Sequence, residues 1–206
     1  MSASLKIALL QESRADEGIY FPLIRAMSND NRFDLTVFHN HLALDTPDWL
    51  IVLGDRQEML EATIDAAYRN IPVAHIQGGD RTSTIDDPAR HAITRFAHLH
   101  FPCTQASADR LLRMGEEEWR IKVVGPLGIY AMPEAEFLSK KQICEKLGLD
   151  ASREIVLVIQ HPVSTQVSQA GEQMRITLEA VKDFQSVVIY PNNDLGSQDM
   201  IKVIED

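Results

Sequence analysis

Short apolar runs alternate along the chain with stretches of amphipathic pattern. The apolar runs predict strands at 5–10, 33–38, 48–53, 71–76, 99–103, 121–124, 154–159 and 186–190. Their apolar residues are continuous rather than alternating, which is typical of parallel strands covered on both faces. The amphipathic stretches predict helices at 18–29, 57–69, 86–97, 105–114, 139–147, 168–183 and 197–205. This alternation predicts an α/β fold with a doubly wound parallel sheet.

The segment 125–137, GPLGIYAMPEAEF, carries glycine and proline directly after a predicted strand. Such residues interrupt regular structure, so we interpret the segment as a hinge between two α/β units. We expect a first domain over 1–130 and a partial second domain over 131–206. The second domain has only two predicted strands, too few for a well-covered sheet of its own.

The link between the predicted strands 33–38 and 48–53, HNHLALDTP, is unusually short. A crossover between neighbouring parallel strands needs about a dozen residues or more and usually includes a helix. Either these strands are not parallel neighbours, or a segment normally found here is absent. We expect residues 39–47 to form an extended or looped link. The sheet would then be under-covered on one face, which favours self-association or a partner.

Composition narrows the classes of partner. The chain has 206 residues and a formal net charge of −10, which argues against broad affinity for nucleic acid or for an anionic membrane. The N-terminal apolar run is too short for a signal peptide, and no stretch approaches the ~20 apolar residues of a membrane span, so we expect a cytoplasmic protein. Cys103 and Cys144 lack the spacing of a zinc site.

The motifs of common cofactor sites are also missing. Neither G-x-G-x-x-G nor the P-loop pattern occurs in the sequence. His91 and His98 are seven positions apart and lack the tighter spacing of a helical metal pair. We therefore expect neither a metal ion nor an organic cofactor.

Polar residues follow several predicted strands at the point where each strand ends. Arg14, Asp55, Gln77 and His161 all occupy such positions. Ligands of doubly wound proteins bind beyond the carboxyl ends of the strands, so these residues indicate a shared crevice. Simpler interpretations stay open: Arg14 could pair with a neighbouring carboxylate, Asp55 could cap a helix, and His161 could be an ordinary loop residue. Gly78 and its neighbouring glycine could approach a ligand or simply make a tight turn.

Asp86 and Asp87 open the predicted helix 86–97. An acidic residue there is favourable through capping and the helix dipole, by about 1 kcal/mol, but two exceed what capping needs. Arg90 lies three positions after Asp87 and can pair with a carboxylate or contact an anion. The segment 86–90 is therefore a candidate for catalytic or ligand-binding residues.

These motifs resemble a known family. PDWLIVLGDRQEML, NIPVAHIQGGD and TIDDPARHAITRFAHLHFPCT are similar to the hydrolysing branch of the UDP-N-acetylglucosamine 2-epimerases, and IQHPVST and VIYPNNDLGS are similar to its second domain. The resemblance implies two Rossmann-like domains facing across a cleft, the glycosyltransferase-B arrangement, here with an incomplete second domain. A plain glycosyltransferase shares this architecture but does not explain the motifs.

The resemblance also implies a reaction. Hydrolysing members convert UDP-N-acetylglucosamine to N-acetylmannosamine and UDP, and relatives act on a 2,4-diacetamido sugar on the route to legionaminic acid, so the expected ligand is a UDP-2-acetamido sugar. A proton leaves C2 with loss of UDP, and the resulting glycal is hydrated. The resemblance implies acid–base or sugar contacts for Asp55, Asp87 and His161, with Asp86 in support. It implies substrate-binding roles for Arg14, His41, Gln77, Gly78 and Arg90.

The sequence departs from the family pattern in four places. Gln77 stands where many relatives have Glu or His, and an amide cannot exchange protons at neutral pH. Glu12 replaces a glycine where the diphosphate would approach. A few dozen family residues are absent after Leu42, and the chain stops before the segment that grips the uridine. The alternative to an active enzyme is thus a truncated, catalytically impaired relative that acts as a binding or partner module. A homo-oligomer is a possible assembly of the chain. On these grounds we expect the isolated chain to turn over UDP-N-acetylglucosamine poorly or not at all.

Overall fold

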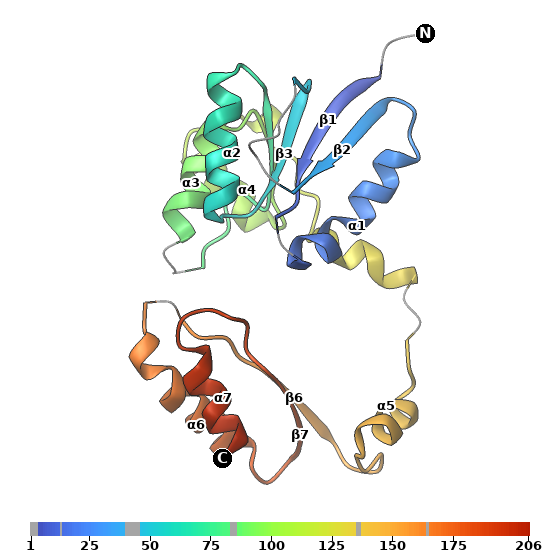
Figure 1. Cartoon of the computed structure of the whole chain (residues 1–206), viewed down its shortest axis with the longest axis vertical. Coiled ribbons are helices and arrows are strands. Elements are labelled where there is room, and N and C mark those ends of the chain that lie inside the picture. The colour runs from blue at the N-terminus through green and yellow to red at the C-terminus, as the bar shows by residue number, and fades with distance from the viewer. Residues whose placement is uncertain (1–3, 13, 40–45, 83–85, 135–136, 164) are drawn as a thin grey trace. The chain divides into compact units, whose positions relative to one another are not determined.

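The computed structural model describes residues 4–12, 14–39, 46–82, 86–134, 137–163 and 165–206. The chain forms two compact units, residues 1–135 and 136–206 (Figure 1). The boundary expected at residue 130 lies within the 3-10 helix η3 (Leu127–Glu134), just before the point where the units divide. No helix within the described ranges is long and apolar enough to cross a membrane.

The first unit is built on a five-stranded parallel sheet with the order β2-β1-β3-β4-β5. The strands are β1 (Leu5–Leu10), β2 (Phe33–Phe38), β3 (Trp49–Leu53), β4 (Val73–Ile76) and β5 (Leu99–Phe101). Because β2 and β3 pair with opposite edges of β1, they are not neighbours. The first explanation of the short link is therefore correct, although residues 40–45 of that link lie outside the described residues.

Helices cover both faces of this sheet, as the continuous apolar strands predict (Figure 1). They are α1 (Arg14–Ser28), α2 (Gln57–Tyr68), α3 (Asp86–Phe96) and α4 (Gln105–Arg113). On one face α2 and α3 bury Met59 and Ile93 against Leu50. On the other face α1 buries Tyr20 against Leu9. Apolar side chains of the strands pack under these helices, which leaves the carboxyl edge of the sheet for polar groups.

The face under α1 is only partly covered. A groove of about 540 Å³ opens there and is lined almost entirely by apolar side chains, among them Leu23, Trp49, Ile76, Leu99 and Phe101. The described end of the short link lies on the opposite face, since Thr46 and Pro47 line a small polar hollow with Lys6, Asp34 and Thr36. The apolar groove therefore lies on the face opposite to Thr46 and Pro47, the described end of the link.

Two predicted elements differ from the structure. The run 121–124 is not a strand: Ile121 forms one isolated bridge with His100, and the exposed Val123 lies beyond β5 with no further strand of unit 1 to pair with among the described residues. The first helix begins at Arg14 rather than at 18. Asp16 and Glu17 favour the earlier start because acidic residues in a first turn interact well with the helix dipole.

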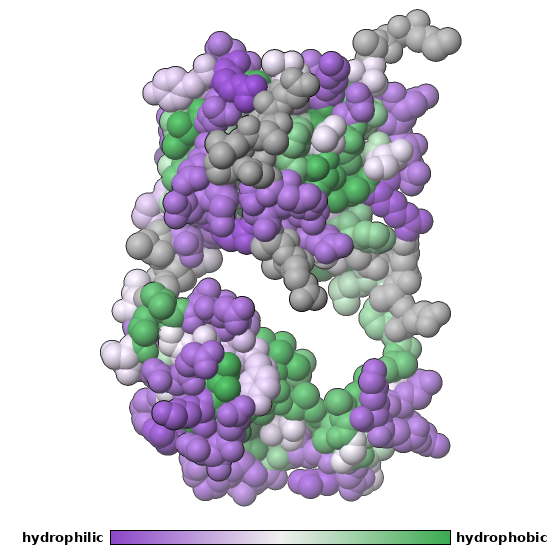
Figure 2. All heavy atoms as spheres, viewed as in Figure 1, coloured by the Kyte–Doolittle hydropathy of each residue, from purple (hydrophilic) through white to green (hydrophobic). Residues whose placement is uncertain are grey.

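The second unit contains a parallel pair, β6 (Ile155–Ile159) and β7 (Gln185–Ile189). Its helices are α5 (Lys140–Leu147), α6 (Ala170–Val181) and α7 (Ser197–Glu205), with short 3-10 helix η4 (Val167–Gln169) before α6. Met174 and Met200 form its core between α6 and α7. Leu157 and Ile159 point the other way and are about 60% exposed, and Figure 2 shows hydrophobic surface along these strands. Within the described part of this unit, the face of the small sheet that carries Leu157 and Ile159 is therefore largely uncovered.

Candidate active site

The carboxyl ends of β3 and β4 form the base of the candidate site. Gly54 follows β3 with φ 75°, and Gln77 follows β4 with φ 62°. The Gly54 N–H donates to the Ile76 carbonyl at 2.9 Å, which ties the two strand ends together. Left-handed backbone is easy for Gly54 but costs energy for Gln77, and strain of that kind gathers at functional sites. The turn at Gly54 brings Asp55 directly onto the sheet edge.

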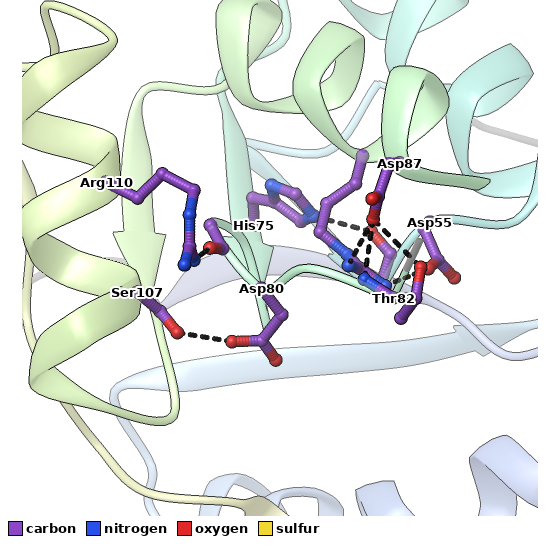
Figure 3. Close-up of polar contacts among 10 residues, drawn as sticks. Asp55, His75, Asp80, Thr82, Asp87, Ser107 and Arg110 are labelled. Carbon is purple, nitrogen blue, oxygen red and sulfur yellow. Dashed lines mark hydrogen bonds and ion pairs between the residues drawn. The ribbon is translucent and has the colours of Figure 1, made fainter. Parts of the chain in front are cut away.

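Three charged side chains from two segments converge here, Asp55 after β3 and Asp87 and Arg90 on α3 (Figure 3). Arg90, on the second turn of α3, donates from Nη2 to Asp55 and from Nη1 to Asp87, the latter at 3.3 Å. The Arg90 side chain is only 6% exposed, and the carboxylates are 19% and 17% exposed. Asp87 also accepts the N–H and the hydroxyl of Thr82, each at 2.8 Å. Asp87 thus not only favours the start of α3 but also connects the helix to Thr82 in the preceding loop.

Burial raises the pKa of Asp55 above its ordinary value. The Arg90 guanidinium opposes this shift, while the charges of Asp86 and Asp87 add to the rise in pKa. A carboxylate with a raised pKa is a stronger base when ionised and exchanges protons closer to neutral pH. Asp55 is therefore suited to acid–base chemistry, and Asp86 influences it by charge.

The loop after β4 is fixed by α4. Asp80 accepts a hydrogen bond from the Ser107 hydroxyl at 2.5 Å, and Arg110 donates to the Gly79 carbonyl. Gly79 has φ 79°, and a Cβ there would lie 2.5 Å from the Ser107 carbonyl oxygen. Glycine is required at this position for both reasons. The loop carrying Gln77 is consequently rigid at its far end.

The loop after β1 is tied to the loop after β3. Asp16 is buried, and it accepts from Arg56 Nη2 at 2.8 Å and from the Glu12 N–H at 3.1 Å. Arg56, which the sequence interpretation had not singled out, thus joins the two loops. Arg14 opens α1, but its side chain is outside the described part of the structure.

The remaining predicted substrate contacts are only partly described. His41 lies outside the described residues. Gln77 is half-buried, and its N–H donates to the Phe101 carbonyl at 3.0 Å. Gly78 is buried, and the space that a Cβ would need is occupied by the ring of His75.

His161 belongs to the second unit, where it follows β6. Its Nδ1 accepts the N–H of Asn192, which follows β7, at 3.1 Å, and its side chain is exposed. The two residues occupy the carboxyl edge of that sheet, the expected place for a ligand-binding group. Because Nδ1 is an acceptor, a neutral His161 carries its proton on Nε2.

One buried residue of the first unit was missed from the sequence. His75, inside the apolar run of β4, is wholly buried and contacts the Gly54 carbonyl through Nε2 at 2.7 Å. The available signal was a polar side chain inside a strand expected to be covered on both faces, since such a group needs a partner. Among the described residues, no group of three His, Cys, Asp or Glu side chains is placed to hold a metal ion.

The family model described as UDP-N-acetylglucosamine 2-epimerase matches residues 34–206. The chain belongs to this family. The UDP-N,N'-diacetylbacillosamine 2-epimerase (hydrolyzing) of Legionella pneumophila is 38% identical over 164 residues, which are 79% of this chain and 44% of that protein. The UDP-N-acetylglucosamine 2-epimerase of Neisseria meningitidis is 29% identical over 158 residues, 76% of this chain and 42% of that protein. The chain thus spans less than half the length of these relatives.

Solved structures of 2-epimerases share the fold. The enzyme from Neisseria meningitidis bound to UDP-GlcNAc matches with a TM-score of 0.81 at 16% identity, over 98% of this chain and 70% of that chain. The enzyme from Methanocaldococcus jannaschii in complex with UDP-GlcNAc and UDP matches with a TM-score of 0.75 at 17% identity, over 97% of this chain and 69% of that chain. The predicted family and the predicted Rossmann-like α/β fold are therefore confirmed.

Proposed function

We propose that this chain releases UDP from a UDP-2-acetamido sugar with inversion at C2, as a hydrolysing 2-epimerase. The substrate would be UDP-N-acetylglucosamine or a 2,4-diacetamido analogue, and the product sugar would feed nonulosonic acid synthesis. Family membership and the printed activity of the Legionella relative support this proposal. The observation that carries it is the pair of carboxylates, Asp55 and Asp87, held on one buried guanidinium at the carboxyl edge of the sheet.

The first step needs a base beside C2. We assign this role to Asp55, because its raised pKa makes the ionised carboxylate a stronger base. The C2–H bond breaks, the C1–O bond to UDP breaks with its electron pair leaving on the phosphate, and a C1–C2 double bond forms. Asp87, already oriented by Arg90 and Thr82, would hold the sugar hydroxyls. Arg90 is too buried to meet the sugar freely and would act through the two carboxylates.

The second step adds water across the double bond, with the oxygen going to C1 and a proton to C2. Inversion requires this proton to arrive on the face opposite to the one it left. We assign the proton donor to His161, which would deliver a proton from Nε2 of its imidazolium form to C2 and return to the neutral ring. The diphosphate would be met by Arg14 and the N-terminus of α1, since helix N-termini attract anions. Gln77 would contribute only hydrogen bonds.

Binding and turnover test the proposal separately. Calorimetric titration with UDP-N-acetylglucosamine and with UDP measures binding, and release of UDP measures turnover. The informative variants are Asp55→Asn and Asp87→Asn. Asp109→Asn is the matched control, because Asp109 is exposed on α4 and accepts a hydrogen bond from Gln105 on the same helix. Turnover that the first two variants abolish supports the proposal. Binding without turnover in the unaltered chain would instead establish a binding module.

A further inference from the structure

His75 lies at the centre of β4 with none of its surface exposed. Its ring occupies the space between the turn after β3 and the helix α3 (Figure 3). Nε2 is 2.7 Å from the Gly54 carbonyl oxygen, and Nδ1 is 3.3 Å from the Thr94 hydroxyl. One buried side chain therefore contacts both segments that supply the carboxylates, although it is itself on neither.

The roles of the two ring nitrogens follow from their partners. The Gly54 carbonyl can only accept, so Nε2 must carry the proton and donate to it. Nδ1 then accepts from the Thr94 hydroxyl. Burial lowers the pKa of His75 to about 3, and the nearby His100 and Arg90 charges act in the same direction. The ring is consequently neutral, with a fixed tautomer.

Gly78 makes room for this ring. A Cβ at Gly78 would lie 2.9 Å from His75 Nδ1 and 3.2 Å from Cε1. Contacts under 3.0 Å are not tolerated by rigid groups, and a buried imidazole with two hydrogen bonds has little freedom to move. The two glycines thus have different roles. Gly79 allows the close approach of α4, and Gly78 leaves space for the ring of His75.

The hydrogen bond from His75 acts on the peptide group between Gly54 and Asp55. A peptide group is planar, so the hydrogen bond from His75 to the Gly54 carbonyl also fixes the orientation of the Asp55 N–H and Cα. Gly54 has φ 75° and no side chain, and the space around its Cβ position is open, so side-chain packing at Gly54 does not restrain this peptide. We propose that His75 is a positioning residue that fixes the Gly54–Asp55 peptide and thereby holds the Asp55 carboxylate on Arg90. Its effect on turnover rests on the proposed function.

Two substitutions separate the hydrogen bond from the packing. His75→Phe keeps a planar ring but removes the donor, whereas His75→Gln keeps an N–H close to the position of Nε2. We expect His75→Phe to lower kcat by about 10- to 100-fold, the scale of a small misplacement of a reacting group, with KM changed by less than about twofold. His75→Gln should recover most of the loss. Equal losses in both variants would overturn the proposal.

A double variant tests whether His75 acts through Asp55. If it does, His75→Phe combined with Asp55→Asn is no slower than Asp55→Asn alone, because the positioned group is already disabled. Multiplied losses would show general structural damage instead and would overturn the proposal. Gly78→Ala provides a second route, since it pushes the ring away without removing the donor, and it should reproduce the kcat loss even if His75→Phe does not fold.

Amide hydrogen exchange tests the positioning without any substrate. In His75→Phe, exchange at Gly54 and Asp55 should become faster, while amides in the middle of β3 keep their protection. His75→Gln should exchange like the unaltered chain. If the unaltered chain neither binds nor converts UDP-N-acetylglucosamine, the proposed function fails, yet these exchange rates still decide the positioning role. Unchanged exchange at Gly54 and Asp55 in His75→Phe would refute it.

Discussion

Arg90 on α3 donates a hydrogen bond to Asp55, a residue 35 positions earlier at the end of β3. The guanidinium is 6% exposed and also meets Asp87, so one buried cation serves carboxylates from two segments. Asp86 adds a third negative charge that acts on Asp55. Burial is the largest cause of the raised pKa of Asp55, and Asp86 and Asp87 add to the rise while Arg90 and Arg56 oppose it.

Asp55→Asn is expected to stabilise the first unit while it abolishes turnover. The raised pKa means that folding favours the protonated carboxyl, so the stability from Asp55 is present at low pH and is lost as pH rises through the folded-state pKa. The neutral amide of asparagine removes the cost of burying a charged carboxylate, and the free energy of unfolding should rise by about 1 kcal/mol. Urea unfolding followed by tryptophan fluorescence reports on this unit, since both tryptophans, Trp49 and Trp119, lie within it. A variant less stable at pH 7 than the unaltered chain would contradict the expectation.

His75 should make the chain less stable in mild acid. Its folded pKa is about 3 and its ordinary value is 6.5, so between these values the unfolded chain binds a proton that the folded chain does not. Stability therefore falls as pH drops below about 6.5, by up to about 1.4 kcal/mol per pH unit from this residue. Unfolding measured at pH 7 and at pH 5 should show a smaller difference in His75→Gln. Burial also lowers the pKa of His100, so His100 should contribute to the difference that persists. An undiminished difference would exclude His75 as the source.

Gly79 and Gly115, two of the glycines with left-handed backbone in the first unit, offer a matched comparison. Gly79 has φ 79° and its absent Cβ would collide with the Ser107 carbonyl, whereas Gly115 has φ 92° and open space around it. Gly115→Ala should cost about 1–2 kcal/mol, the penalty of the conformation alone. Gly79→Ala carries the collision as well and should cost more, by about 1–3 kcal/mol. Equal losses in thermal unfolding would show that α4 yields to the extra methyl group.

The groove under α1 should bind an apolar dye in the folded state. Trp49 lines the groove, so a bound anilinonaphthalene dye should take up energy from its fluorescence. Leu23→Glu places a charge among the apolar lining residues and should abolish the dye signal. Ile64→Glu is the control, because Ile64 is exposed on α2 and does not line the groove. A signal lost equally in both variants would mean that the dye reports general loosening.

The position of the candidate site residues at the sheet edge could be predicted from the sequence, but the contacts among them could not. The rule that ligands bind at strand ends placed Asp55 and Gln77 at one edge, and the structure agrees. Whether Arg90 on α3 reaches Asp55 depends on the rotation of α3 about its axis, which packing against α2 decides. His75 was missed because an apolar run hides a polar residue whose partner is 21 positions away. The strand order could not be predicted either. The short link after β2 indicates that β2 and β3 are not neighbours, but it does not say which strand lies between them.

The most direct test of the proposed mechanism is to measure whether the hydrogen at C2 of the sugar exchanges with solvent. The chain and UDP-N-acetylglucosamine are incubated in D₂O at comparable concentrations, so that a single slow turnover is detected, and UDP and the product sugar are analysed by NMR. The account predicts UDP together with N-acetylmannosamine that carries deuterium at C2. Asp55→Asn and Asp87→Asn should each slow the reaction by at least about 100-fold, the scale of a lost acid or base, while Asp109→Asn leaves it unchanged. Product without deuterium at C2, or UDP release that survives both substitutions, would contradict it.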